Sequence, residues 1–310
     1  MTRTTVTSMT NAPRKPALSV IATPTKRRTI IDLAIQADER GFSGLALPSL
    51  GGTMGLAVSL AHSTRSIRFW TSIQPIYYSH PVETGNIAAH INEVSDGRFA
   101  LGLGVSHGPV VKRLNVNTGK PLADIETYVE ALRANEKTSG PLPHIYLATL
   151  RDKMLALASR VSDGAIWANA SRSHMATQLG SLDSAMTSRM FLANMIPTVI
   201  DEDQAAADAV NRRTLLGYVI LPNYRNYWRG AGYVEEMDRI EAALSAGDKD
   251  SVLTAMSDDW LHDCTLGGNA TFVRDGLEAW FDEGVTPIAV MSSTSGGQVK
   301  AIGELFDAYS

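Results

Sequence analysis

The chain has 310 residues, of which 44% are hydrophobic, and this fraction supports a buried core and excludes a disordered chain. Its 28 lysines and arginines against 32 aspartates and glutamates give a formal charge of −4. This balance suits a cytoplasmic protein and offers no broad attraction for nucleic acid or anionic lipid, although a local basic pocket for a phosphate is allowed.

From residue 17 onward, short apolar runs alternate with segments of helical periodicity. The predicted strands are 17–22, 44–47, 67–73, 99–103, 144–147, 164–167, 190–199 and 286–291. The predicted helices are 25–40, 54–62, 81–94, 122–134, 152–161, 173–183 and 299–309. Eight strands that alternate with helices indicate a parallel sheet, and they match a closed (β/α)₈ TIM barrel better than an open sheet.

One helical stretch exceeds a minimal barrel. Residues 201–255 are mostly helical, and we predict that 216–263 is an insertion or an elaborated seventh helix within a single domain of residues 17–310. Its aromatic residues either pack helices or subunits together or line one wall of an apolar substrate site; they are Tyr218, Tyr224, Tyr227, Trp228 and Tyr233.

The N-terminus and the single cysteine carry little functional signal. Residues 1–16 are rich in Thr, Ser, Arg and Pro and lack an apolar signal core, so we expect a flexible leader. No apolar run approaches the about 20 residues of a membrane span. Cys264 is the only cysteine, which excludes a disulfide and a cysteine-rich metal site, and we expect it to be buried rather than nucleophilic. We predict no metal.

Two glycines end the fourth predicted strand. Gly102 and Gly104 precede Ser106 and His107, without the third glycine of a dinucleotide fingerprint, and we expect no helix directly after them. Glycine at the carboxyl end of a barrel strand removes side chains. The pair would therefore let a flat ring or a phosphate lie against the backbone.

Residues 95–104, with the sequence Ser-Asp-Gly-Arg-Phe-Ala-Leu-Gly-Leu-Gly, resemble the strand-four signature of luciferase-like flavin- or deazaflavin-dependent oxidoreductases. Segments 37–42, 67–73 and 145–165 resemble the same family in order and spacing. Ser106-His107 and the helix with Tyr128 are most similar to enzymes that use coenzyme F420, a 5-deazaflavin. The resemblance implies a barrel that binds F420, with FMN as the alternative.

The resemblance also implies where the cofactor ring lies. Thr71, Ser72 and Ile73 fall where the family often has a bulge with a non-prolyl cis peptide behind the ring; the alternative is an ordinary strand. Trp167 ends the sixth predicted strand and either stacks on a ring or packs in the core.

The family's usual phosphate site follows the fifth predicted strand. Here that loop contains Thr149 and Arg151, and Arg151 replaces the usual glycine. Asp152 would oppose a phosphate, whereas Arg151 and Lys153 would attract one. A solvated helix start is the alternative.

The proton donor is the second departure from the family. Many relatives have an acidic residue after the second strand, where this chain has Ser49, a poor acid. We list Ser49 and His107 as catalytic candidates, with a tyrosine, water or the substrate as other proton sources. His107 would contact the cofactor or assist proton transfer; the alternative is a capping or surface histidine.

These residues predict an oxidoreductase that transfers hydride from reduced F420 to an apolar small molecule. One alternative is an FMN-dependent monooxygenase, supplied by a separate flavin reductase. The other is a catalytically silent barrel that acts as a binding or assembly protein. The family and the outer helices indicate a homo-oligomer, and we expect a dimer.

Overall fold

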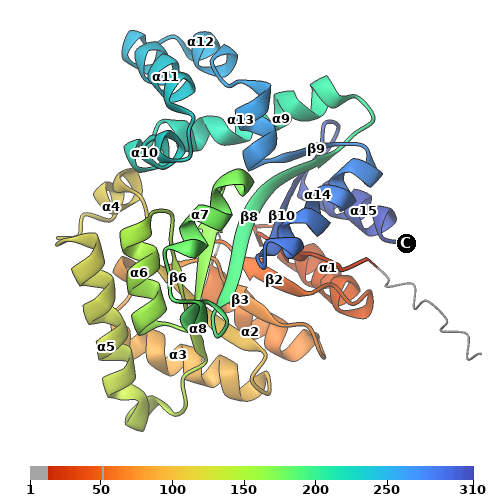
Figure 1. Ribbon diagram of the computed structural model, residues 1–310. Helices are drawn as coiled ribbons and strands as arrows, with labels where there is room; N and C mark the ends of the chain where they lie inside the picture. Colours follow the sequence, from red (N-terminus) through yellow and green to blue (C-terminus); the bar gives the residue numbers. More distant parts are fainter. Residues whose placement is uncertain (1–12, 51) are drawn as a thin grey trace, which may run out of the picture.

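The structure, a computed structural model, describes residues 13–50 and 52–310. The barrel strands are β1 (Ala17–Ser19), β2 (Gly44–Leu47), β3 (Phe69–Thr71), β5 (Phe99–Gly104), β6 (His144–Ala148), β7 (Gly164–Ala168), β8 (Phe191–Ile200) and β10 (Thr286–Ser292). Within the described residues they form a parallel sheet in the order β10-β1-β2-β3-β5-β6-β7-β8, and β10 pairs with β8 to close the ring (Figure 1). The predicted TIM barrel is confirmed.

Helices cover the outside of this ring (Figure 1). They include α1 (Arg27–Glu39), α2 (Thr53–Ser63), α3 (Pro81–Val94), α4 (Gly108–Leu114), α5 (Pro121–Ser139), α6 (Asp152–Val161), α7 (Met175–Gly180), α8 (Ser184–Thr187), α14 (Ala270–Asp282) and α15 (Gln298–Ala308). In α1, Ile30, Leu33, Ala34 and Ala37 are buried, which is the stripe of an amphipathic helix. No helix in the described part of the chain has the length and apolarity needed to cross a membrane.

Two hydrophobic clusters fill the molecule, because strand side chains alternate between the inside and the outside of a barrel. The inner cluster consists of Ala17, Ala46, Trp70, Ala100, Tyr146, Ile166, Ala193 and Ile288. Trp70 and Tyr146 pack on Phe191 with ring centroids at 5.0 and 4.7 Å. A Cβ at Gly44 would overlap the Trp70 ring, and one at Gly164 would lie 2.6 Å from Tyr146. These glycines make room for the large inner rings.

The third barrel strand is interrupted. After β3 the chain passes through Ser72 and Ile73, joined by a cis peptide bond, and resumes as β4 (Gln74–Pro75). β3 pairs with the start of β5, and β4 pairs with its end. The strand predicted for 67–73 is therefore shorter than expected, whereas the non-prolyl cis peptide that the family resemblance implied at Ser72-Ile73 is confirmed.

The predicted insertion is a group of helices at the carboxyl ends of the strands. It comprises α9 (Gln204–Val219), α10 (Pro222–Gly230), α11 (Val234–Ala246), α12 (Lys249–Thr254) and α13 (Asp258–Cys264). Figure 1 shows these helices above the end of the barrel where β8 finishes. After α13, the short strand β9 (Leu266–Gly268) pairs in parallel with the last residues of β8.

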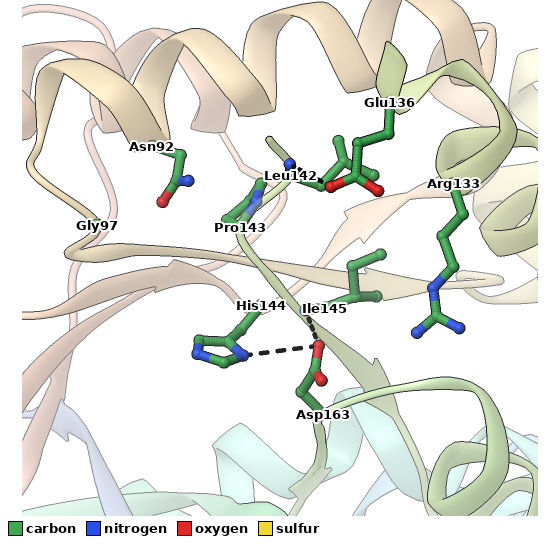
Figure 2. A pocket seen from close by; sticks show the side chains of 9 residues that line it. All are labelled: Asn92, Gly97, Arg133, Glu136, Leu142, Pro143, His144, Ile145 and Asp163. Atoms are coloured by element: carbon green, nitrogen blue, oxygen red, sulfur yellow. Dashed lines mark hydrogen bonds and ion pairs between the residues drawn. The ribbon is translucent and has the colours of Figure 1, made fainter. Parts of the chain in front are cut away.

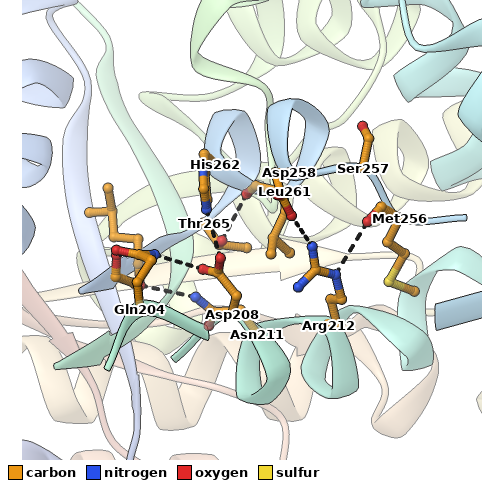
Figure 3. A network of polar contacts seen from close by, with 12 residues as sticks. Gln204, Asp208, Asn211, Arg212, Met256, Ser257, Asp258, Leu261, His262 and Thr265 are labelled. Atoms are coloured by element: carbon orange, nitrogen blue, oxygen red, sulfur yellow. Dashed lines mark hydrogen bonds and ion pairs between the residues drawn. The ribbon is translucent and has the colours of Figure 1, made fainter. Parts of the chain in front are cut away.

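A polar network joins α9 to β9 and α13 (Figure 3). Gln204 and Asn211 donate from α9 to two backbone carbonyls of β9, at 2.9 and 3.0 Å. The buried Asp208 accepts from Gln204 at 2.8 Å and lies 3.0 Å from Nε2 of His262 on α13. The network fixes both ends of the insertion to the same end of β8.

Of the predicted leader, residues 1–12 lie outside the described residues. Residues 13–16 run beside α14, where Arg14 donates to Glu278 at 2.6 Å and pairs with Asp282. The extent of the single domain stays a prediction.

Candidate active site

Buried polar atoms without partners gather at the carboxyl face, the end of the barrel where the strands finish. Ser19 ends β1, Ser72 follows β3, Thr149 follows β6 and Asn169 follows β7. Each is buried, and its hydroxyl or its amide nitrogen has no hydrogen-bond partner among the described residues. Buried polar groups are normally paired, so a polar ligand bound at this face would satisfy them.

The two strand-end glycines, Gly102 and Gly104, leave room for the chain where it is interrupted between β3 and β4. A Cβ at Gly102 would overlap the carbonyl oxygen of Thr71, and one at Gly104 would lie 2.8 Å from Ile73. The Thr71 hydroxyl donates to the Gly102 carbonyl at 2.7 Å. The space beside these glycines is therefore filled by the chain itself. Their predicted role of clearing room for a ring stays a prediction; the structure shows that they admit the bulge, which contains the unpaired Ser72 hydroxyl.

His107 lies between the barrel and the insertion. The preceding residue, Ser106, has a positive φ of 63°. The α4 helix begins directly after His107. As expected, no helix starts directly after Gly104, because residues 105–107 come first; the short helix α4 that Gly108-Pro109 then opens was not predicted. The His107 ring is half-buried, makes no capping bond, and lies 5.8 Å from the Tyr224 ring of α10. Burial lowers the pKa of His107.

The loop after β6 opens the α6 helix. Thr149 is buried, whereas Arg151 is exposed and precedes the first residue of α6. Gln178 of α7 donates to the Leu150 carbonyl and to the Asp152 carboxylate, both at 3.2 Å. Asp152 is therefore held by a neutral amide, while Arg151 and the free N–H groups of α6 remain available to an anion.

Aromatic residues fasten the insertion to the loop after β7. The Trp228 indole donates to the Asn169 carbonyl at 3.2 Å, and the Ser171 N–H donates to the Tyr227 hydroxyl at 3.1 Å. The Tyr218 and Tyr224 rings meet at 5.1 Å. Most of these side chains pack the insertion, and Tyr224 also contacts the His107 loop. No pattern in the sequence indicates that contact, because it joins segments about 117 residues apart.

The model of the luciferase-like monooxygenase family matches residues 2–287. This chain belongs to the luciferase-like monooxygenase family. Its curated relatives include a protein of Mycobacterium tuberculosis named "Putative coenzyme F420-dependent oxidoreductase Rv3520c". That relative is 26% identical over 293 residues, which cover 78% of this chain and 84% of the relative.

Two solved structures show the same fold. The coenzyme F420-dependent tetrahydromethanopterin reductase of Methanopyrus kandleri has a TM-score of 0.71 and 16% identity, over 95% of this chain and 97% of that one. The oxygenating constituent of the Pseudomonas putida 3,6-diketocamphane monooxygenase, in complex with FMN, has a TM-score of 0.63 and 14% identity, over 95% and 97%.

Two predicted site residues of this luciferase-like chain, Ser49 and Trp167, differ in their location and burial. Ser49 is half-buried, two residues beyond β2, at the carboxyl face. Trp167 alternates with the inward-facing Ile166 and is fully buried in the core between the barrel and the helices. This burial is what packing in the core predicts, and stacking on a cofactor stays an untested prediction.

Of two surface cavities of this luciferase-like barrel, one lies at the amino ends of the strands and the other beside their carboxyl ends, at the starts of α3 and α5. One, of about 490 Å³, is at the start of β6, where Asp163 accepts from the Ile145 N–H and lies 3.7 Å from His144 (Figure 2). The other, of about 370 Å³, lies between α3 and α5. Neither contains a predicted site residue. Among the described residues no group of His, Cys, Asp and Glu could hold a metal ion.

Proposed function

We propose that this chain is an oxidoreductase that binds coenzyme F420 at the carboxyl face and acts on an apolar small molecule. The observation that carries this proposal is the set of unpartnered buried polar atoms at Ser19, Ser72, Thr149 and Asn169, which share one face. The names of relatives in the same family support the choice of F420. When bound, the reduced deazaflavin would supply the hydride.

The cofactor would lie between the bulge and the loop after β6. Ser72 offers a buried hydroxyl to a ring or its side chain, and Ile73 gives an apolar backing. Thr149, Arg151 and the α6 N-terminus suit a phosphate, since free N–H groups and a guanidinium both bind anions.

His107 is the stronger candidate for holding a proton. Its pKa is lowered by burial, so the ring is largely neutral near pH 7 and can accept a proton or donate a hydrogen bond. Ser49 stays a candidate that would need a further base, because a serine hydroxyl is a poor acid. The Tyr218 and Tyr224 pKa values are raised by burial, which keeps both hydroxyls neutral.

Titration of the purified protein with F420, followed by the cofactor's fluorescence, tests the proposal. We expect saturable binding at micromolar concentrations, and a Ser72→Ala variant should bind about five- to tenfold more weakly, because it removes one buried hydrogen-bonding group. Ser63→Ala, on the outside in α2, is the matched control. Absence of binding by F420 and by FMN would reject the enzyme function and leave the catalytically silent barrel.

The FMN-dependent monooxygenase is the second candidate, because a structure of the same fold contains FMN. For this function we expect FMN to bind more tightly than F420. We also expect the protein to consume oxygen when NADH and a separate flavin reductase are supplied. We further propose a cytoplasmic homodimer; light scattering that gives the mass of one chain would reject the dimer.

A further inference from the structure

The larger of the two surface cavities lies at the amino ends of the strands, with a volume of about 490 Å³. Active sites of TIM barrels lie at the other end, the carboxyl face. This cavity, which we name the amino-face cavity, is therefore separate from the candidate active site. The lining residues that bear on its chemistry are Arg133, Glu136, Leu142, Pro143, Ile145 and Asp163.

Three charged side chains of the amino-face cavity do not pair with one another. Arg133 and Glu136 are three residues apart in α5, a spacing at which opposite charges are neighbours and can form an ion pair. Among the described residues neither of them makes one, and the ion-pair contact of Asp163 is with His144, at 3.7 Å. Figure 2 shows Glu136 and Asp163 on opposite sides of the start of β6, with Arg133 to the right.

Backbone groups hold each of these charges in place. The Arg133 guanidinium donates to the Val161 carbonyl at 2.8 Å. Oε1 of Glu136 accepts from the Leu142 N–H at 3.1 Å, and Oδ2 of Asp163 accepts from the Ile145 N–H at 2.8 Å. The second oxygen of each carboxylate and two nitrogens of the guanidinium make no hydrogen bond within the described residues. They are thus free for a ligand, and their fixed positions lower the entropic cost of binding it.

The wall between the charges is apolar. Leu142 is half-buried, Pro143 and Ile145 are buried, and all three line the cavity. The cavity volume lies within the range of about 300–1,000 Å³ that is typical of small-molecule sites. A complementary ligand therefore carries one negative and one positive group together with an apolar body.

We propose that the amino-face cavity binds a small zwitterion, an α-amino acid with an apolar side chain. The ligand's carboxylate pairs with Arg133, and its ammonium group pairs with Glu136 and Asp163. Its side chain covers Leu142 and Pro143. This site goes beyond the proposed function and does not depend on it, because the cofactor would bind at the opposite end of the barrel.

NMR titration of the full chain with three probes tests the proposal. L-Phenylalanine carries both charges, 2-phenylethylamine lacks the carboxylate, and 3-phenylpropanoate lacks the ammonium group. We expect L-phenylalanine to shift the amide signals of Leu142 and Ile145 with a Kd on the order of millimolar. Each of the other probes should bind about two- to fivefold more weakly, because it loses an ion pair with exposed groups.

Conservative variants connect each ligand charge to its partner. Arg133→Gln should bind L-phenylalanine and 2-phenylethylamine equally. The double variant Glu136→Gln, Asp163→Asn should bind L-phenylalanine and 3-phenylpropanoate equally, and its amide oxygens can still accept from the backbone N–H groups. Glu130→Gln, an exposed glutamate of α5 outside the cavity, is the matched control and should keep all three affinities.

The wild type alone can overturn the proposal. It fails if L-phenylalanine shifts no signal of the cavity up to its solubility limit, or if either singly charged probe binds as tightly. Shifts confined to the carboxyl face would also reject it. A folded variant that keeps the wild-type preference among the probes would reject the assigned pairing. The F420 titration is a separate measurement, so none of these outcomes bears on the proposed function.

Discussion

Gly102 has no room for a side chain, because a Cβ there would overlap the Thr71 carbonyl oxygen. We expect Gly102→Ala to displace the bulge, to lower the free energy of unfolding by about 1–3 kcal/mol and to weaken cofactor binding. Urea denaturation and fluorescence titration measure the two effects. Gly55→Ala in α2 is the control, since a Cβ meets nothing within 4 Å there and the change should be neutral or stabilising. Equal stability of the two variants would contradict this explanation of Gly102.

His107 should make stability depend on pH. Its folded pKa is lowered, so between that value and the unfolded value near about 6.5 the unfolded chain binds more protons than the folded one. The contribution is fully present above about pH 6.5 and is lost as the pH falls towards the folded pKa. We therefore expect His107→Gln to lose less stability than the wild type between pH 8 and pH 5.

Urea denaturation at both pH values gives this comparison, and NMR titration of the ring gives the pKa directly. His90→Gln, an exposed residue of α3, is the control. A His107 ring that titrates at or above the ordinary histidine value would refute the prediction.

The sequence indicated several site residues without giving the physical reason for them. Gly102 and Gly104 stood out as strand-end glycines, but the atoms that exclude a Cβ come from a strand about 30 residues away. Trp167 was placed at the carboxyl face because it ends a predicted strand, although it follows the inward-facing Ile166 and therefore faces the outside of the ring. The facing of a strand depends on register, which a five-residue apolar run does not specify.

At the level of elements, the insertion depends on its polar contacts with β9. Asp208 is buried and accepts from Gln204 and His262, so Asp208→Ala leaves the His262 ring and the Gln204 amide each one partner short. We expect a loss of about 1–3 kcal/mol in the free energy of unfolding and faster hydrogen exchange in α13 and β9. Asp32→Ala, on the exposed side of α1, should change neither. Unchanged exchange in β9 would show that the network does not hold the insertion.

Apolar periodicity predicted the barrel strands and most of the helices, because their buried faces repeat every two or about 3.6 residues. The prediction also missed α14, although Val273, Leu277 and Trp280 form a buried stripe on it. Two other missed elements, α4 and β9, have no such pattern. The α4 helix has seven residues and buries none of them, so it has no apolar stripe. The β9 strand is Leu-Gly-Gly, too short to alternate, and it forms by pairing with β8 rather than by local preference.

For the whole molecule, the barrel topology brings residues that are far apart in the sequence together at one face. The carboxyl ends of parallel strands meet at one face, so residues from four distant segments converge there once the ring closes. The eight-strand pattern was enough to predict that convergence. The position of α10 beside His107 was not predictable, because it follows from tertiary contacts of the insertion.

These contacts predict that the insertion and the barrel unfold as one unit. Trp228 and Trp260 lie in the insertion and Trp70 inside the barrel, and all are buried. Unfolding the insertion alone would expose Trp228, break its bond to the Asn169 carbonyl and separate β9 from β8. We therefore expect tryptophan fluorescence and far-UV circular dichroism to report one coincident urea transition, as in a two-state system.

Trp228→Phe and Trp260→Phe variants separate the signals of the two parts. In a variant without both indoles, the remaining fluorescence comes from the barrel and from the helices around it, and its midpoint should still match the circular dichroism midpoint. A fluorescence midpoint of the double variant at higher urea than the circular dichroism midpoint would mean that the insertion unfolds first. In that case α9–α13 would be a separate folding unit, and the single domain predicted for residues 17–310 would be wrong.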